Sequence, residues 1–116
     1  MSHLYTKLIG EALNPDLVVR FPEIKKISKY KNVDKYNANW SPVIDNAPHL
    51  HAAIDQHLDE LLRAHDTLTQ LGVTERVLYV TVTESLQGNF ELSEEQVQKL
   101  ASLNAALAVT VVYRKA

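Results

Sequence analysis

The chain contains no cysteine and only three glycines. The first absence excludes disulfides, thiolate nucleophiles and cysteine-based metal sites. The scarcity of glycine agrees with the lack of either glycine-rich phosphate-binding pattern, G-x-G-x-x-G or G-x-x-x-x-G-K-[ST]. There is also no apolar run long enough to span a bilayer and no signal-peptide pattern. We therefore expect a cytoplasmic protein without a membrane partner.

Charge is distributed unevenly along the chain, although the net charge is only −2. Between Arg20 and Lys35, six basic residues stand against two acidic ones; between Tyr36 and Ala105, three basic residues stand against ten acidic ones. The lysine-rich segment Glu23–Lys35 could contact nucleic-acid phosphates. A solvated loop is the simpler explanation in an acidic chain, so a nucleic-acid partner is not expected.

We expect the 116 residues to form one domain, 1–116, that is organised around a long helix and the strand that follows it. The helix is predicted after Ala47, with Pro48 in its first turn, Asp45 or Asn46 as a cap, and Gly72 at its end. Its apolar residues recur every three or four positions and form one stripe: Leu50, Ile54, Leu58, Leu61, Leu62, Leu68 and Leu71. The strand Arg76–Glu84 is rich in β-branched residues.

The remaining segments supply smaller elements around this pair. Strands are predicted at His3–Ile9, Tyr36–Val43 and Ala106–Arg114, with an irregular connection at Glu23–Lys35. A short helix is expected after Asn14-Pro15-Asp16. The capping box of Ser93 and Gln96 predicts the start of another helix, which is expected to bury Val97, Leu100 and Ala101. The fold class is an α/β two-layer sandwich: a mostly antiparallel sheet of about four strands with helices on one face.

Catalytic and metal sites lack support in the sequence. His51 and Asp55 lie four residues apart on the long helix, but His49 points elsewhere and no H-E-x-x-H pattern is present. No serine lies in a nucleophile-elbow pattern. We therefore expect no metal, no cofactor and no catalytic residues.

Two surfaces are candidates for binding. An acidic outer face of the long helix could attract a basic protein partner, with contacts at Asp55, Asp59, Glu60 and Asp66. A pocket between helix and sheet could instead be lined by Trp40, His65 and Tyr79, although a core tryptophan and a hydrogen-bonded histidine are the simpler interpretations. A homodimer could also form through the open sheet face at Thr81, Thr110 and Val112.

Several motifs together resemble an uncharacterised bacterial family of small α/β domains of unknown function. They are Tyr5-Thr6-Lys7-Leu8-Ile9, Leu13-Asn14-Pro15-Asp16-Leu17-Val18, Asn39-Trp40-Ser41, Leu92-Ser93 and Leu100-Ala101-Ser102-Leu103. The resemblance covers most of the chain and implies a fold without implying catalytic residues. As a class, small acidic cysteine-free bacterial α/β proteins also resemble immunity proteins that neutralise contact-dependent or polymorphic toxins.

The predicted function is therefore that of a non-enzymatic protein-binding module, most concretely a toxin-immunity protein. A homodimeric or small-ligand-binding domain is the alternative.

Overall fold

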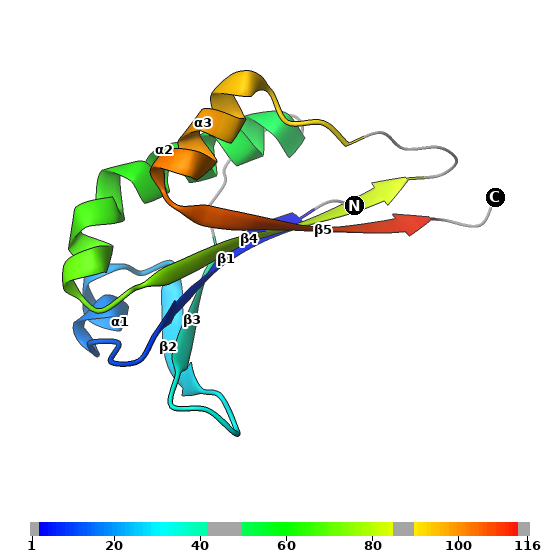
Figure 1. Cartoon of the computed structure of the whole chain (residues 1–116). Coiled ribbons are helices and arrows are strands. Elements are labelled where there is room, and N and C mark those ends of the chain that lie inside the picture. The colour runs from blue at the N-terminus through cyan, green and yellow to red at the C-terminus, as the bar shows by residue number, and fades with distance from the viewer. Residues whose placement is uncertain (1–2, 42–49, 85–89, 114–116) are drawn as a thin grey trace.

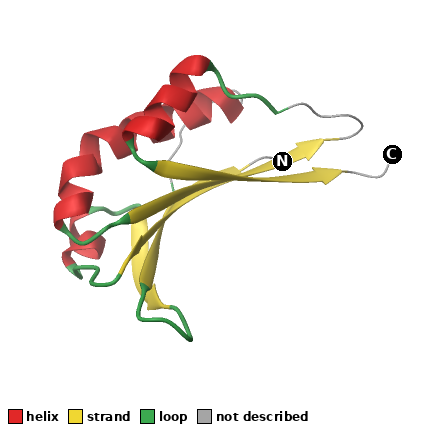
Figure 2. Ribbon diagram, in the orientation of Figure 1, coloured by secondary structure: helices red, strands yellow, loops and turns green. Residues whose placement is uncertain are grey.

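The computed structural model describes residues 3–41, 50–84 and 90–113, which form a five-stranded sheet with helices on one face (Figures 1 and 2). In chain order the elements are β1 (His3–Gly10), α1 (Asp16–Arg20), β2 (Ile24–Lys29), β3 (Tyr36–Trp40), α2 (Leu50–Gln70), β4 (Glu75–Glu84), α3 (Glu94–Ser102) and β5 (Ala105–Tyr113). None of the helices in these ranges is both long and apolar enough to cross a membrane.

The sheet has the order β2-β3-β1-β4-β5, and only the β4–β5 pairing is parallel. This confirms the predicted α/β class and the mostly antiparallel sheet. The expected irregular connection at Glu23–Lys35 instead contains β2, which raises the strand number to five. Its apolar residues explain the difference: Ile24 is buried opposite Trp40, and Ile27 is half-buried opposite Ala38.

The apolar stripe of α2 lies on the sheet as predicted. Leu58, Leu61 and Leu68 are fully buried, together with Leu8 of β1 and Leu78 of β4. Full burial of a leucine side chain contributes about 1.5–3 kcal/mol, so this contact is a main source of stability. The predicted caps at Asp45 or Asn46, and Pro48 in the predicted first turn, lie outside the described residues.

Helix α3 begins with the predicted capping box. Ser93 accepts a hydrogen bond from the Gln96 amide, and the Gln96 side chain accepts one from the Ser93 amide. Leu100 is buried, but Val97 and Ala101 are exposed, contrary to the sequence prediction. The reason is that α3 lies near the edge of the sheet and packs along α2, so only one side of it is covered (Figure 1).

The end of β1 crosses the turn between α2 and β4 at very short range. Gly72 ends α2 with φ 101°, as its position predicted, in a region that favours glycine. A Cβ atom on Gly10 would overlap the carbonyl oxygen of Gly72. The amide of Thr74 donates to the carbonyl of Ile9 at 2.8 Å, and the amide of Asn14 donates to that of Leu71 at 2.9 Å. Both hydrogen bonds require the backbone at the end of β1 to lie in van der Waals contact with the turn that follows α2.

We predict that Gly10→Ala lowers the free energy of unfolding by about 2 kcal/mol or more, because backbone must move against backbone to admit the methyl group. Gly72→Ala is expected to act in the same direction through its positive φ. Urea unfolding followed by circular dichroism measures both effects. An unchanged midpoint in Gly10→Ala would contradict the close crossing.

Candidate functional site

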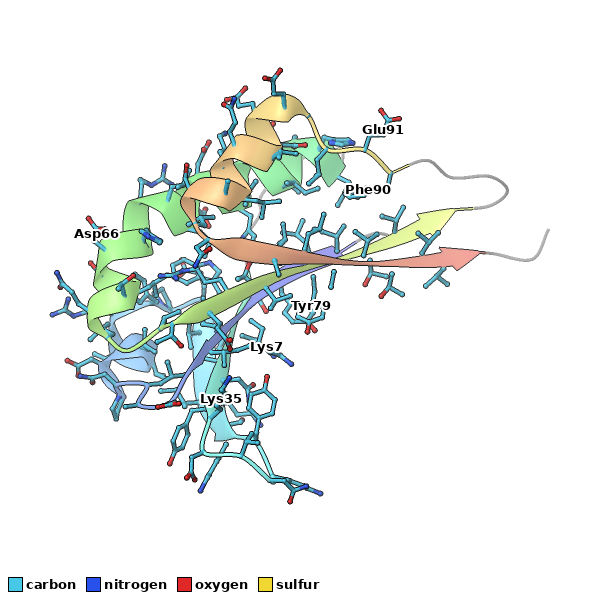
Figure 3. All side chains as sticks on the ribbon, viewed as in Figure 1. Lys7, Lys35, Asp66, Tyr79, Phe90 and Glu91 are labelled. Carbon is cyan, nitrogen blue, oxygen red and sulfur yellow. The ribbon has the colours of Figure 1, made fainter. Side chains whose placement is uncertain are left out.

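Two tyrosines lie side by side on the sheet face that the helices leave uncovered. Tyr5 of β1 and Tyr79 of β4 are directly opposite in the strand register, and their rings stack with centroids 5.1 Å apart and planes 10° from parallel. Lys7 lies beside them, with its Nζ 5.5 Å from the Tyr79 ring centroid and 5.8 Å from that of Tyr30. Figure 3 shows Tyr79 and Lys7 on the side of the sheet away from α2 and α3.

The residues around this stack are also largely uncharged. We call this surface the aromatic sheet face; it consists of Tyr5, Lys7, Val77, Tyr79, Thr81 and Ala108, all half-buried. An antiparallel sheet face that meets only water normally carries polar residues at outward positions. A surface rich in tyrosine and poor in charge is instead typical of the centre of a protein interface.

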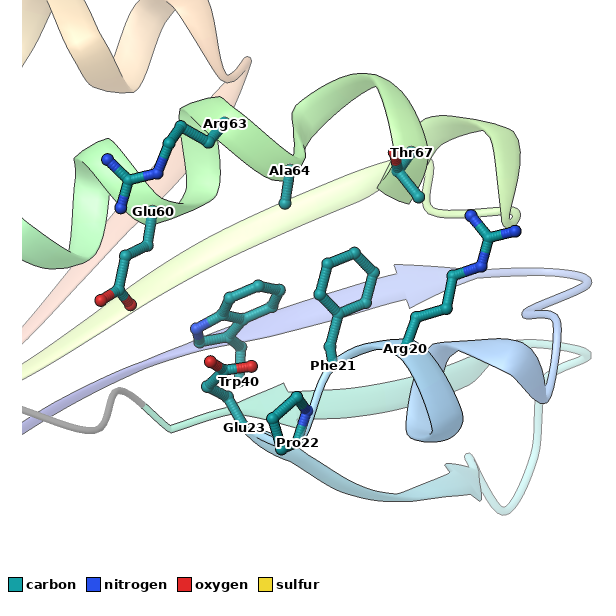
Figure 4. A pocket seen from close by; sticks show the side chains of 9 residues that line it. All are labelled: Arg20, Phe21, Pro22, Glu23, Trp40, Glu60, Arg63, Ala64 and Thr67. Carbon is teal, nitrogen blue, oxygen red and sulfur yellow. The ribbon is translucent and has the colours of Figure 1, made fainter.

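A second candidate is a cavity between α1, α2 and β3 on the opposite side of the sheet (Figure 4). It has a volume of about 400 Å³ and contains the indole of Trp40, which is 3% exposed and packs on Phe21 at 5.0 Å between ring centroids. The other lining residues are Arg20, Pro22, Glu23, Glu60, Arg63, Ala64 and Thr67. We call this cavity the Trp40 pocket.

Two buried polar atoms of the Trp40 pocket lack a hydrogen-bond partner among the described residues. They are the indole Nε1 of Trp40, which is a donor, and Oε2 of Glu60, which is an acceptor. Figure 4 shows Glu60 reaching from α2 toward the indole. Because an unsatisfied buried polar group costs about 1–3 kcal/mol, the two atoms are candidates for pairing with ordered water or with a bound polar molecule.

The three residues that the sequence suggested for one pocket do not converge. Trp40 lies on the helix side of the sheet, whereas Tyr79 lies on the uncovered face. His65 is half-buried on α2, and its backbone carbonyl accepts a hydrogen bond from Arg76 of β4 at 3.4 Å. Alternation along β4 separates Tyr79 from the helices, so no pocket can include all three.

The four acidic residues suggested for partner contacts are also divided between different environments. Asp55 accepts a hydrogen bond from Gln96 at 3.0 Å, and Asp59 forms a 2.9 Å ion pair with Lys99, so both help to hold α3 on α2. The hydrogen bond with Asp59 raises the pKa of Lys99. Glu60 lines the Trp40 pocket, and Asp66 is exposed.

His51 and His57 of α2 both contact side chains of other segments of the fold. The ring of His51 stacks on Phe90 with centroids 5.9 Å apart, and its Nδ1 lies 3.4 Å from Oε1 of Gln96. His57 is fully buried, and its Nε2 shares a 2.6 Å hydrogen bond with the hydroxyl of Thr6. Within the described ranges, no three histidine or carboxylate side chains cluster as metal ligands would. His49 lies outside them.

A scan against protein-family models, a search of curated proteins and a search of solved structures each found no match to this chain. The resemblance to a bacterial family of unknown function, and the class likeness to immunity proteins, therefore stay predictions.

Sequence reasoning missed the pairing of Tyr5 with Tyr79 and the role of Gln96 between the helices. Alternation in His3–Ile9 places Tyr5 and Lys7 on one face, but only the strand register brings Tyr79 beside them. The sequence predicts Gln96 as a capping residue. Its Nε2 also donates to Asp55 and to the carbonyl of His51, which required knowledge of how α3 packs.

Burial lowers the pKa of His57 to about 4, from 6.5 in an exposed histidine. As the pH falls from about 6.5 toward 4, His57 therefore becomes protonated in the unfolded chain while it stays neutral in the native protein. We predict that the free energy of unfolding falls by about 2 kcal/mol from this group between pH 7.5 and pH 5. Urea unfolding at both pH values, compared with His57→Gln, measures it. An equal pH dependence in the two proteins would contradict the prediction.

Proposed function

We propose that this chain is a non-enzymatic protein-binding module that docks a partner on the aromatic sheet face. Its most concrete role is that of an immunity protein that neutralises a contact-dependent or polymorphic bacterial toxin. The single observation that supports this proposal most is the stacked pair of Tyr5 and Tyr79 at the centre of an uncovered, largely uncharged sheet face.

Tyrosine suits this task because its large ring buries apolar area while its hydroxyl can still form a hydrogen bond. The stack also holds both rings in place before a partner arrives, which reduces the entropy lost on binding. Lys7, beside Tyr79, offers a positive charge to a carboxylate of the partner. Alanine scans of interfaces find that tyrosines of this kind carry much of the binding free energy.

The acidic residues of α2 enter this proposal in a smaller role. Asp55, Asp59 and Asp66 fall on one stripe of the helix, whereas Glu60 lies on another flank. Asp55 and Asp59 are engaged by α3, which leaves Asp66 as the exposed member of the stripe. Such a charge can raise the association rate of a basic partner, with little effect on final affinity.

We predict that Tyr5→Lys and Tyr79→Lys abolish protection of cells that express the toxin-like product of a neighbouring open reading frame. Val19→Lys is the control, because it adds the same charge at a site that is 81% exposed on α1 and lies outside the aromatic sheet face. Growth rescue and co-elution of the two proteins are the measurements. Asp66→Lys should alter the salt dependence of association and leave rescue intact.

Rescue that survives both tyrosine substitutions would overturn the docking surface. If a single-stranded oligonucleotide bound in a way that required Tyr5 and Tyr79, and no toxin were neutralised, the face would instead belong to nucleic acid, because exposed aromatic rings also stack on bases.

A small-ligand-binding function is the second candidate, and the unpaired atoms of the Trp40 pocket favour it. A ligand that pairs with both atoms must accept from the indole N–H and donate to the Glu60 carboxylate. A free amino acid carries both kinds of group, and Arg20 and Arg63 line the same pocket and can receive its carboxylate.

We predict that one of the common amino acids changes the fluorescence of Trp40 saturably, and that Glu60→Gln weakens its binding about tenfold or more. Trp40 is the only tryptophan in the chain, so its emission reports on this pocket alone. Glu94→Gln, an exposed glutamate on α3, serves as the control. Trp40 emission that stays unchanged with each of the common amino acids would exclude an amino-acid ligand.

A further inference from the structure

Among the described residues, the last strand of the sheet has a free edge. β5 ends the order β2-β3-β1-β4-β5, and the only strand of the described ranges that pairs with it is β4, so one side of its backbone carries N–H and C=O groups that face away from the sheet. Such an edge is a template for another strand unless the protein protects it.

The two edge strands of this sheet, β2 and β5, differ in charge and in the regularity of their pairing. At the opposite edge, β2 carries Lys25, Lys26 and Lys29, all exposed, and its register with β3 shifts between Ile24 and Ile27. Lysines and register irregularities are devices that prevent a further strand from pairing. β5 has neither: Ala105–Tyr113 contains no charged residue and no proline, and it pairs with β4 over nine consecutive residues.

Exposed apolar side chains gather on the same part of the molecule. Among the described residues, seven large apolar side chains are exposed, and five of them lie on α3 or β5. They are Val97 (52%), Leu107 (39%), Val109 (39%), Val111 (37%) and Val112 (46%). Leu107, Val109 and Val111 are in register with buried residues of β4, yet the helices do not cover them. Figure 1 shows the far halves of β4 and β5 extending beyond α2 and α3.

We infer that a second copy of this chain covers this edge, with the two β5 strands antiparallel about a two-fold axis at Val109. Residues directly opposite in such a pair lie on the same face of the sheet. Leu107 then meets Val111 of the second copy, Val109 meets its own equivalent, and Val111 meets Leu107. All three exposed apolar side chains on the helix side are thereby paired with apolar side chains.

The sequence of β5 identifies the occupant. An added strand here must be uncharged, rich in β-branched residues and free along one edge, and β5 itself meets these requirements. Two-fold symmetry also makes one patch sufficient for both partners, which is the usual arrangement of homodimers. A charged peptide would find no opposite charge along Ala105–Tyr113.

The same two-fold axis also brings the exposed side of α3 close to the second copy. Because the strands run in opposite directions, the α3 helix of each copy approaches the uncovered far half of the other copy's β5. Val97 and Ala101, one turn apart and both exposed, are then available to pack on Val111 of the second copy. The pairing therefore covers four of the five exposed apolar side chains on α3 and β5: Val97, Leu107, Val109 and Val111.

The dimer also extends the proposed function, although it does not depend on it. A two-fold axis perpendicular to the sheet keeps both aromatic sheet faces on the same side of one continuous sheet. Two docking faces in one rigid body can raise the apparent affinity for a partner that presents two copies of its own surface.

We predict that the purified chain sediments at twice its mass of 13.1 kDa and that Val109→Lys makes it monomeric, because two lysines would then oppose each other at the axis. Val19→Lys is the matched control: Val19 is 81% exposed on α1, which contacts β2 at the opposite edge of the sheet from β5, so its substitution should leave the dimer intact. Analytical ultracentrifugation over a range of concentrations measures both.

A charge-exchange pair tests the register. Leu107→Glu alone should weaken the dimer at least tenfold, and the double variant Leu107→Glu with Val111→Lys should restore it, because opposite charges then meet on both sides of the axis. If a variant failed to fold, hydrogen exchange of the wild-type protein would still decide the matter, since amides on the outer edge of β5 should gain protection as concentration rises.

A wild-type monomer at all concentrations, with unprotected β5 amides, would overturn the inference while leaving the tyrosine test untouched. A monomer that binds a different protein only while Val109 is present would also overturn self-pairing, and would assign the β5 edge to that protein.

Discussion

The contact between the apolar stripe of α2 and the inner face of the sheet is the constraint on which this structure depends. Leu58, Leu61 and Leu68 are removed from water only because β1 and β4 lie beneath them. That contact decides which way every strand residue points, since side chains alternate between faces. Tyr5 and Tyr79 face away from the helices as a direct result, and Trp40 faces toward them.

Polar groups tie the second helix to this frame and leave part of the sheet uncovered. Gln96, Asp55, Asp59 and Lys99 hold α3 against α2 through hydrogen bonds and an ion pair. Because α3 follows α2 in this way, it covers the beginning of β5 and not its end (Figure 1). The exposure of Val109 and Val111 is thus a consequence of how α3 is anchored, and the proposed dimer supplies the cover that α3 does not.

The two proposed binding surfaces lie on opposite sides of one rigid sheet. The aromatic sheet face offers uncharged rings, while the Trp40 pocket offers a buried donor and a buried acceptor near two arginines. A protein surface suits the first and a small polar molecule suits the second. Neither needs the other to move, so a single chain can carry both functions.

By itself, the sequence determined the α/β class, the stripe of α2, the strand β4, the glycine that ends α2 and the capping box of α3. These features depend on residues close together in the chain, where periodicity and local hydrogen bonding decide the outcome. Only the tertiary structure decided that Glu23–Lys35 supplies an edge strand, that Asp55 and Asp59 serve helix packing, and that Tyr79 lies beside Tyr5 and away from Trp40. Those outcomes depend on register and on contacts between distant segments, which a local pattern does not encode.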